Sequence, residues 1–193
     1  MKFNLSRVLI LASLMVGLTG CGENKKVATL KQQLQSDKPS HRHRAAKVLG
    51  EMGPNAEEGV PALMEALKDK DAKVRHYAAR SLGRIGPGSK DAASGLIEAL
   101  KDRDANVRAA AAQSLGKIGL DTDEAVPPLT EVLKDNDAKV RRAAVMSLGS
   151  FGASARSASP ALKIALKDSN REVRDAAAIA LKRIGKTDGK RPG

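Results

Sequence analysis

Apolar residues recur along the chain with two superimposed periods. Over short distances they are three and four residues apart, as in Val60, Leu63 and Leu67, which places them on one face of a helix. Over longer distances the pattern returns every 33 residues, at Leu30, Leu63, Leu96, Leu129 and Leu162 and at Gly53, Gly86, Gly119, Gly152 and Gly185. A period of this length is typical of proteins built from stacked structural repeats.

Each 33-residue unit predicts two helices, here called helix A and helix B. Pro61 and Pro127 suit the first turn of helix A, where the missing N–H has no partner to lose. An N-cap of helix B is predicted at Asp71, Asp104, Asp137 and Asn170, and Lys38 followed by Pro39 occupies the same place in the first unit. Helix B is expected to run to Ile85 and to stop at Gly86, followed by a loop of about six residues.

Five such units account for most of the chain, at about 27–59, 60–92, 93–125, 126–158 and 159–185. Within helix B, Val74, Ala78, Leu82 and Ile85 form one apolar stripe. Aromatic residues make up only 2% of the chain, so the core must rest on aliphatic side chains, with Ala and Gly allowing close approach of helices. The predicted fold is all-α, an α-solenoid of about five helix pairs.

The repeated motif strongly resembles HEAT repeats, specifically the short type of phycobilisome-lyase-like proteins. In the second unit it comprises Val74-Arg75, Ala78-Ala79 and the segment LGRIG that ends at Gly86. Two departures lie in the terminal units, His41 in place of Val and Lys182 in place of Gly. The resemblance implies a curved solenoid in which B helices line the concave side and A helices the convex side.

One arginine recurs in every unit, at Arg42, Arg75, Arg108, Arg141 and Arg174. On a helical wheel it lies beside the apolar stripe and away from the open face. A partly buried guanidinium requires a local partner, so we expect a structural ladder with the acidic turns, at Asp69, Asp71, Asp104 and Asp137. Phosphate binding is the alternative interpretation of five identical arginines.

The open face of helix B varies between units, which favours a binding surface there. In the second unit it carries Lys73, His76, Tyr77, Arg80 and Arg84. The surface is expected to be basic near unit two and more apolar near Met146 and Ile179. The predicted partner-binding residues are Arg44, Lys47, Lys73, His76, Tyr77, Arg80, Arg84, Lys117, Arg142 and Met146. A solvated basic face without a partner is the alternative.

Residues 1–20 have the features of a secretory signal. Lys2 and Arg7 precede an uncharged run from Val8 to Leu18, which is shorter than the about 20 apolar residues that span a membrane. The residues that follow, Leu18 to Cys21, resemble the lipobox of bacterial lipoproteins. The resemblance implies cleavage before Cys21, a diacylglyceryl group on its thiol, and a short linker over 21–26.

The predicted anchor and the charge bear on location and partner. The net charge is +12, and removal of Lys2 and Arg7 lowers it to +10, which favours an acidic partner. Gly22 follows the cysteine where an Asp would direct retention, so the lipoprotein resemblance implies the outer membrane in a two-membrane bacterium. In a bacterium with one membrane it implies the outer face of the plasma membrane. Residues 186–193 are expected to form a flexible tail.

Catalytic and metal-binding motifs are lacking in the sequence. The histidines are His41, His43 and His76, without an evident third metal ligand or any His-Glu pair. His-Glu pairs hold the iron of the HEAT-like deoxyhypusine hydroxylases. We therefore expect no cofactor and no enzyme activity, and interpret the chain as a membrane-anchored scaffold for a protein partner. One alternative is an enzyme or chromophore-handling protein like the phycobilisome lyases, against which the export signal counts. The other is polyanion or nucleic-acid binding, against which both the export signal and the scarcity of aromatic rings count.

Overall fold

The computed structural model describes residues 24–185, which contain helices and turns but no strand. Residues 24–33 form the first A helix. The other A helices are α3 (Val60–Ala66), α5 (Ala93–Ala99), α7 (Thr122–Val132) and α9 (Ser159–Ala165). The B helices are α2 (Pro39–Met52), α4 (Ala72–Ile85), α6 (Ala105–Leu115), α8 (Ala138–Ser150) and α10 (Arg171–Gly185).

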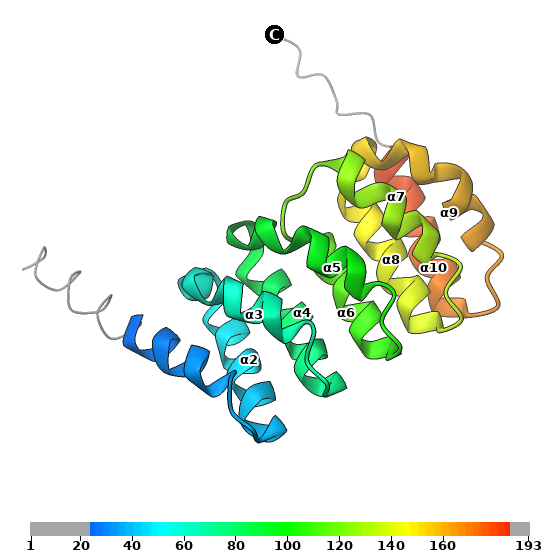
Figure 1. Ribbon diagram of the computed structural model, residues 1–193. Helices are drawn as coiled ribbons and strands as arrows, with labels where there is room; N and C mark the ends of the chain where they lie inside the picture. The colour runs from blue at the N-terminus through cyan, green and yellow to red at the C-terminus, as the bar shows by residue number, and fades with distance from the viewer. Residues whose placement is uncertain (1–23, 186–193) are drawn as a thin grey trace, which may run out of the picture.

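The helix pairs stack in sequence order into the predicted all-α solenoid (Figure 1). Each B helix packs against the next, from α2 on α4 through to α8 on α10, whereas α3, α5, α7 and α9 have little direct contact with one another. Close packing on the B side and spreading on the A side curve the array. The B helices therefore line the concave side and the A helices the convex side.

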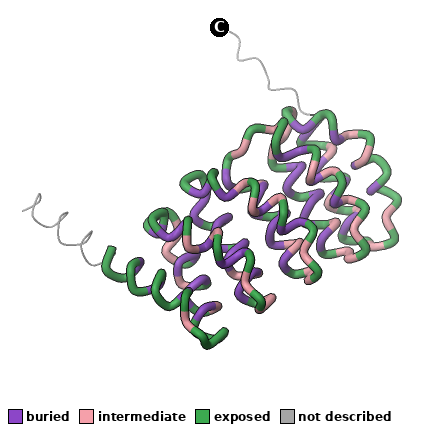
Figure 2. The backbone as a smooth tube through the Cα atoms, in the orientation of Figure 1, coloured by how far each residue is buried: buried purple, intermediate pink, exposed green. Residues whose placement is uncertain are grey.

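A continuous core lies between the two helix layers (Figure 2). Leu63 of α3 and Leu96 of α5 are fully buried on the A side, and Val74 and Leu82 of α4 on the B side. Small residues bring neighbouring B helices together: Ser81 Oγ donates to the Ala46 carbonyl at 2.7 Å, a bond repeated 33 residues on by Ser114 to Ala79 and Ser147 to Ala112.

Helix α4 begins and ends where the sequence predicts, whereas α6 already ends at Leu115, three residues before the position equivalent to Ile85. The Asp71 carboxylate accepts hydrogen bonds from the N–H groups of Lys73 and Val74 at 2.8 and 3.2 Å. Asp104, Asp137 and Asn170 cap their helices in the same way. Gly86 follows Ile85 with φ of +77°, a left-handed conformation that stops the helix.

Three local expectations were wrong. The connections after α2, α4 and α8 are 3₁₀ helices, η1 (Gly53–Gly59), η2 (Gly86–Ala92) and η3 (Gly152–Ala158). In η2 the Ser89 hydroxyl lies 2.7 Å from the carbonyl oxygens of both Leu82 and Gly86, which holds this connection against the end of α4. Pro127 lies inside α7, since that helix already begins at Thr122 with acidic residues in its first turn. The first A helix includes residues 24–26, which we had assigned to a linker.

Candidate binding surface on the concave face

The turn between helices A and B fixes each repeat to the next through an arginine–aspartate pair. Arg42 Nε and Nη2 donate to the two carboxylate oxygens of Asp69 at 2.6 and 2.9 Å, while Nη1 donates to the carbonyls of Ser36 and Asp37. The same arrangement recurs in three further pairs, Arg75–Asp102, Arg108–Asp135 and Arg141–Asp168. These contacts occupy four of the five guanidinium N–H groups, which leaves little for a phosphate.

The carboxylates in this ladder are only partly those that we expected. Asp69 is a ladder residue, but Asp71, Asp104 and Asp137 are N-caps and do not form its ion pairs. The ladder carboxylate lies two residues earlier, where it also accepts the N–H of the N-cap residue, as Asp69 does from Asp71 at 2.8 Å. Arg174 donates Nη1 to the carbonyls of Asp168 and Ser169, and it forms no ion pair within residues 24–185.

The ladder shifts the titration of its carboxylates. Burial alone would raise the pKa of Asp69, but hydrogen bonds from Arg42 and from the Asp71 N–H outweigh it and hold that pKa below its ordinary value. The pKa values of Asp102 and Asp135 are lowered for the same reasons, and that of Asp168 chiefly by its hydrogen bond from Arg141. The four carboxylates are therefore charged at neutral pH and belong to the framework.

The predicted partner-binding residues lie on the open side of the B helices. On α4, Lys73, Arg80 and Arg84 are exposed, and His76 and Tyr77 are half-buried. The other five, Arg44, Lys47, Lys117, Arg142 and Met146, are exposed. Ala110 and Ala143, at the positions of their repeats that are equivalent to Arg44 and Tyr77 and so predicted on the open face, are buried, because neighbouring helices cover a short side chain at that position while Arg44 extends past them.

An aromatic cluster joins the first B helices on this face. The Tyr77 ring lies 5.8 Å from that of His43 on α2 and meets the His76 ring edge-on at 5.2 Å. His76 Nδ1 is 3.1 Å from the carbonyl oxygen of Asn106, which ties α4 to α6. No group of three or more His, Cys, Asp or Glu residues in the described part of the chain could hold a metal ion.

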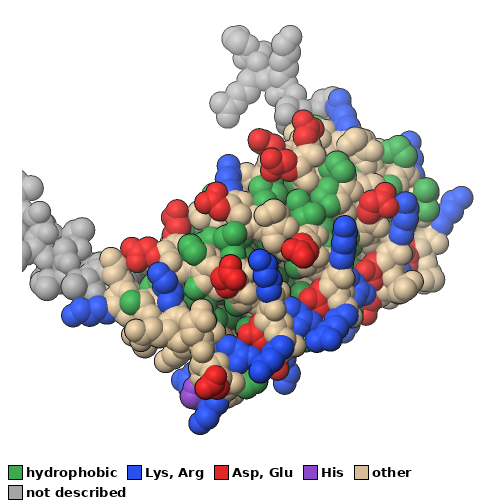
Figure 3. All heavy atoms as spheres, viewed as in Figure 1, with side chains coloured by type: hydrophobic (Ala, Val, Ile, Leu, Met, Phe, Trp, Pro, Cys, Tyr) green, Lys and Arg blue, Asp and Glu red, His purple; other side chains and the backbone are tan. Residues whose placement is uncertain are grey.

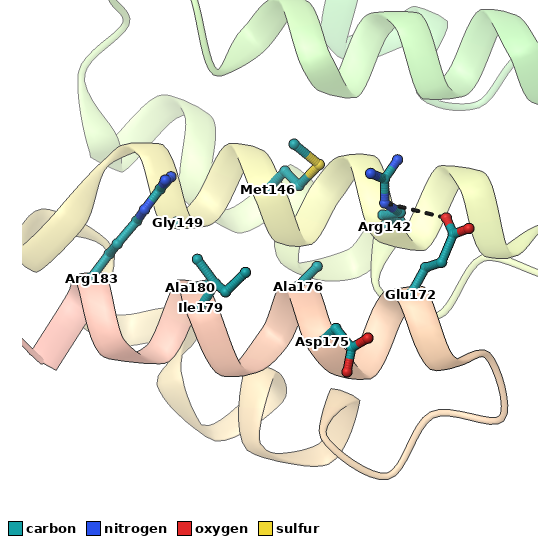
Figure 4. A pocket seen from close by; sticks show the side chains of 9 residues that line it. All are labelled: Arg142, Met146, Gly149, Glu172, Asp175, Ala176, Ile179, Ala180 and Arg183. Atoms are coloured by element: carbon teal, nitrogen blue, oxygen red, sulfur yellow. Dashed lines mark ion pairs between the residues drawn. The ribbon is translucent and has the colours of Figure 1, made fainter.

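A shallow hollow of about 330 Å³ lies between α8 and α10 at the other end of the face (Figure 4). Met146 and Ile179, which are 48% and 57% exposed, provide its apolar wall. The Arg142–Glu172 ion pair, 3.5 Å long, lies at one end and Arg183 at the other. The concave face thus combines a cationic, aromatic end with a more apolar end, where Met146 and Ile179 lie between charged side chains.

A family model for HEAT repeats matches residues 27–98, 60–149 and 93–182. The chain belongs to the HEAT-repeat family. It is similar to a protein in the complex of CpcE and CpcF of phycocyanin lyase from Nostoc sp. PCC7120, with 30% identity and a TM-score of 0.73. The match covers 82% of this chain and 65% of the other, slightly less than two thirds of that protein.

Two designed proteins share the solenoid fold. An engineered protein is 26% identical with a TM-score of 0.69, over 82% of this chain and 78% of the other. A designed armadillo repeat protein in complex with the peptide (KR)4 has a TM-score of 0.65 at 18% identity, over 80% of each chain, and this likeness concerns the fold alone. No curated protein matches the chain.

The predicted signal segment, Cys21 and the tail from 186 onward lie outside the described residues. Among residues 24–185, no helix is both long and apolar enough to cross a bilayer.

The sequence pointed to the arginines of the ladder but missed most of their partners. Asp102, Asp135 and Asp168 recur with the same 33-residue period as the arginines, in the motif Lys-Asp-x-Asp/Asn. That periodicity was the available signal. This signal was obscured because the residue two positions after each ladder aspartate is also acidic in three repeats, and that residue is the better N-cap candidate.

Proposed function

We propose that this chain is a lipid-anchored, non-catalytic HEAT-repeat scaffold on the outside of a bacterial membrane, which binds an acidic protein partner through its concave face. The observation that carries the proposal is the contrast between the two sides of each B helix. The core side is nearly identical in each repeat, whereas the open side changes from cations and Tyr77 to the Met146–Ile179 hollow. Solenoids commonly use their extended concave surface for binding.

Charge and exposure support an acidic partner. Arg44, Lys73, Arg80 and Arg84 are exposed and form no ion pair among the described residues. Cations on such a surface accelerate encounter with an acidic protein, and desolvated Arg and Tyr contacts supply much of the binding free energy at an interface.

The test is capture from a bacterial envelope extract with residues 22–193, followed by titration of the captured protein. The decisive variant is Arg80→Glu with Arg84→Glu, and its matched control is Lys90→Glu with Arg156→Glu, two exposed cations on η2 and η3. We expect the first variant to bind the captured protein at least tenfold more weakly, and the second to bind it as tightly as the unchanged chain does. Equal retention by both variants would contradict the proposal.

Anchoring is tested separately. Replacement of Cys21 by Ala removes the proposed acylation site, and we expect the protein to leave the membrane fraction, since acyl chains contribute about 0.8 kcal/mol per buried methylene. Membrane flotation of extracts from cells that express the full chain measures this membrane association. Continued membrane association of the variant would contradict lipidation at Cys21.

One alternative has a specific observation in its favour, the similarity to a protein of the phycocyanin lyase complex. In that case the concave face would bind a chromophore or another cofactor and assist its transfer. Absorbance titration with a bilin would distinguish the two functions, because only the alternative requires a pigment complex that depends on the aromatic cluster around Tyr77.

A further inference from the structure

A row of lysines runs along the edge of the array formed by the turns between helices A and B. The turns of the second to fifth repeats read Lys-Asp-x-Asp or Lys-Asp-x-Asn, and their lysine is exposed in every case. We call Lys68, Lys101, Lys134 and Lys167 the lysine row. The stacking of the repeats places one such lysine per helix pair along a single edge.

The acidic residues beside these lysines are engaged inside the framework. The first aspartate of each turn binds the ladder arginine of the preceding repeat, as Asp69 binds Arg42. The second residue caps helix B, as Asp71 does for α4. No ion pair involves Lys68, Lys101 or Lys167 among residues 24–185, and Lys134 pairs only with the exposed Glu131 at 3.1 Å, an interaction that contributes little.

The two edges of the array therefore differ in charge. Further exposed cations lie on the same edge as the lysine row, at Lys70, Arg103, Lys139 and Arg171. The opposite edge, formed by the connections from helix B to the next helix A, carries exposed acids at Glu57, Glu58, Asp91, Asp121, Asp123 and Glu124, as well as the exposed cations Lys90 and Arg156. Figure 3 shows Lys and Arg side chains gathered along the turn edge and several Asp and Glu side chains along the other.

We propose that the lysine row is a docking surface for the anionic headgroups of a lipid bilayer, which holds the array edge-on to the membrane. Evenly spaced point charges suit a laterally continuous anionic surface, and the acidic edge would then face away from it. Among residues 24–185 the lysine row has no Tyr or Phe ring beside it on which bases could stack, since Tyr77 lies on the concave face and Phe151 follows α8 at the opposite edge. The proposal rests on the proposed membrane location, but its test needs no lipidation.

The test uses residues 22–193, which contain every described residue and lack the acylation site. The probe is a set of vesicles with one part phosphatidylglycerol to two parts phosphatidylcholine, compared with pure phosphatidylcholine. The edge variant carries K68Q, K101Q, K134Q and K167Q. The matched control carries K47Q, R80Q, R84Q and K117Q, which removes four charges from the concave face.

We expect the chain to bind the anionic vesicles and not the neutral ones. The edge variant should bind about a hundredfold or more weakly, since each lysine near the surface contributes about a fivefold effect, and the control less than tenfold. Equal losses in the two variants, or no preference for anionic vesicles, would overturn the proposal. If the chain prefers a soluble heparin fragment to the anionic vesicles when the two compete, the edge is assigned to a soluble polyanion and the proposal is overturned. Failure here leaves partner capture by Arg80 and Arg84 unaffected, so the two proposals fail separately.

Discussion

Arg75 and Arg80 lie on the same helix, five residues apart, in two different regions of the molecule. Arg75 belongs to the turn region, where both members of its ion pair are about nine-tenths buried and the same pair links consecutive repeats. Arg80 belongs to the concave face, is exposed, and has lysine, glutamine, methionine and isoleucine at the equivalent positions of the other repeats. The repeated arginine holds the array together, and the variable one is available to a partner.

The largest effect should follow from removal of a ladder arginine. Arg75→Met keeps much of the side-chain volume but leaves the Asp102 carboxylate, which is about nine-tenths buried, without its partner, and the carbonyls of Asp69 and Lys70 without their donor. We expect the free energy of unfolding to fall by about 3 kcal/mol. Urea denaturation measures it. The matched control Arg80→Met should change stability by less than about 0.5 kcal/mol, and equal effects of the two would contradict the distinction between the regions.

A smaller loss should follow from widening the contact between B helices. A Cβ at Gly83 would overlap Ser114 of the next repeat, including its Cα atom, so Gly83→Val must push α4 and α6 apart. We expect a loss of about 1–3 kcal/mol by urea denaturation. Gly185→Ala is the control, because no residue of the described part of the chain lies within 4 Å of the added Cβ, and it should leave stability unchanged or slightly higher. A neutral Gly83→Val would show that the helices are not held by this contact.

The smallest of these effects concerns pH. The four ladder aspartates have pKa values below the ordinary one, so they bind protons more weakly in the folded chain than in the unfolded chain. Their stabilisation is present above the unfolded pKa of about 4 and is lost as the pH falls through the lower folded values. The urea midpoint should therefore decrease below about pH 4. An Asp102→Asn variant should show a shallower decrease, and an identical slope would remove Asp102 from the acid transition.

The difference between the two regions also explains which features of the fold the sequence predicts and which it does not. Periodicity predicted the helix pairs, the apolar stripe through Val74 and Leu82, and the N-caps, because each depends on residues close in the sequence. The ladder partners were missed because Arg75 and Asp102 are 27 residues apart and the pairing depends on how two repeats stack. The early start of α7 and the burial of Ala143 likewise depend on neighbouring elements that local patterns do not contain.

The most direct measurement pairs stability with partner capture for Arg75→Met and for Arg80→Glu with Arg84→Glu. We expect the Arg75 variant to unfold at lower urea concentration, while its folded fraction still captures the partner. The Arg80/Arg84 variant should keep its urea midpoint and lose the partner. A drop in stability of the Arg80/Arg84 variant equal to that of the Arg75 variant, with capture unchanged, would contradict the assignment of the concave face as the binding surface.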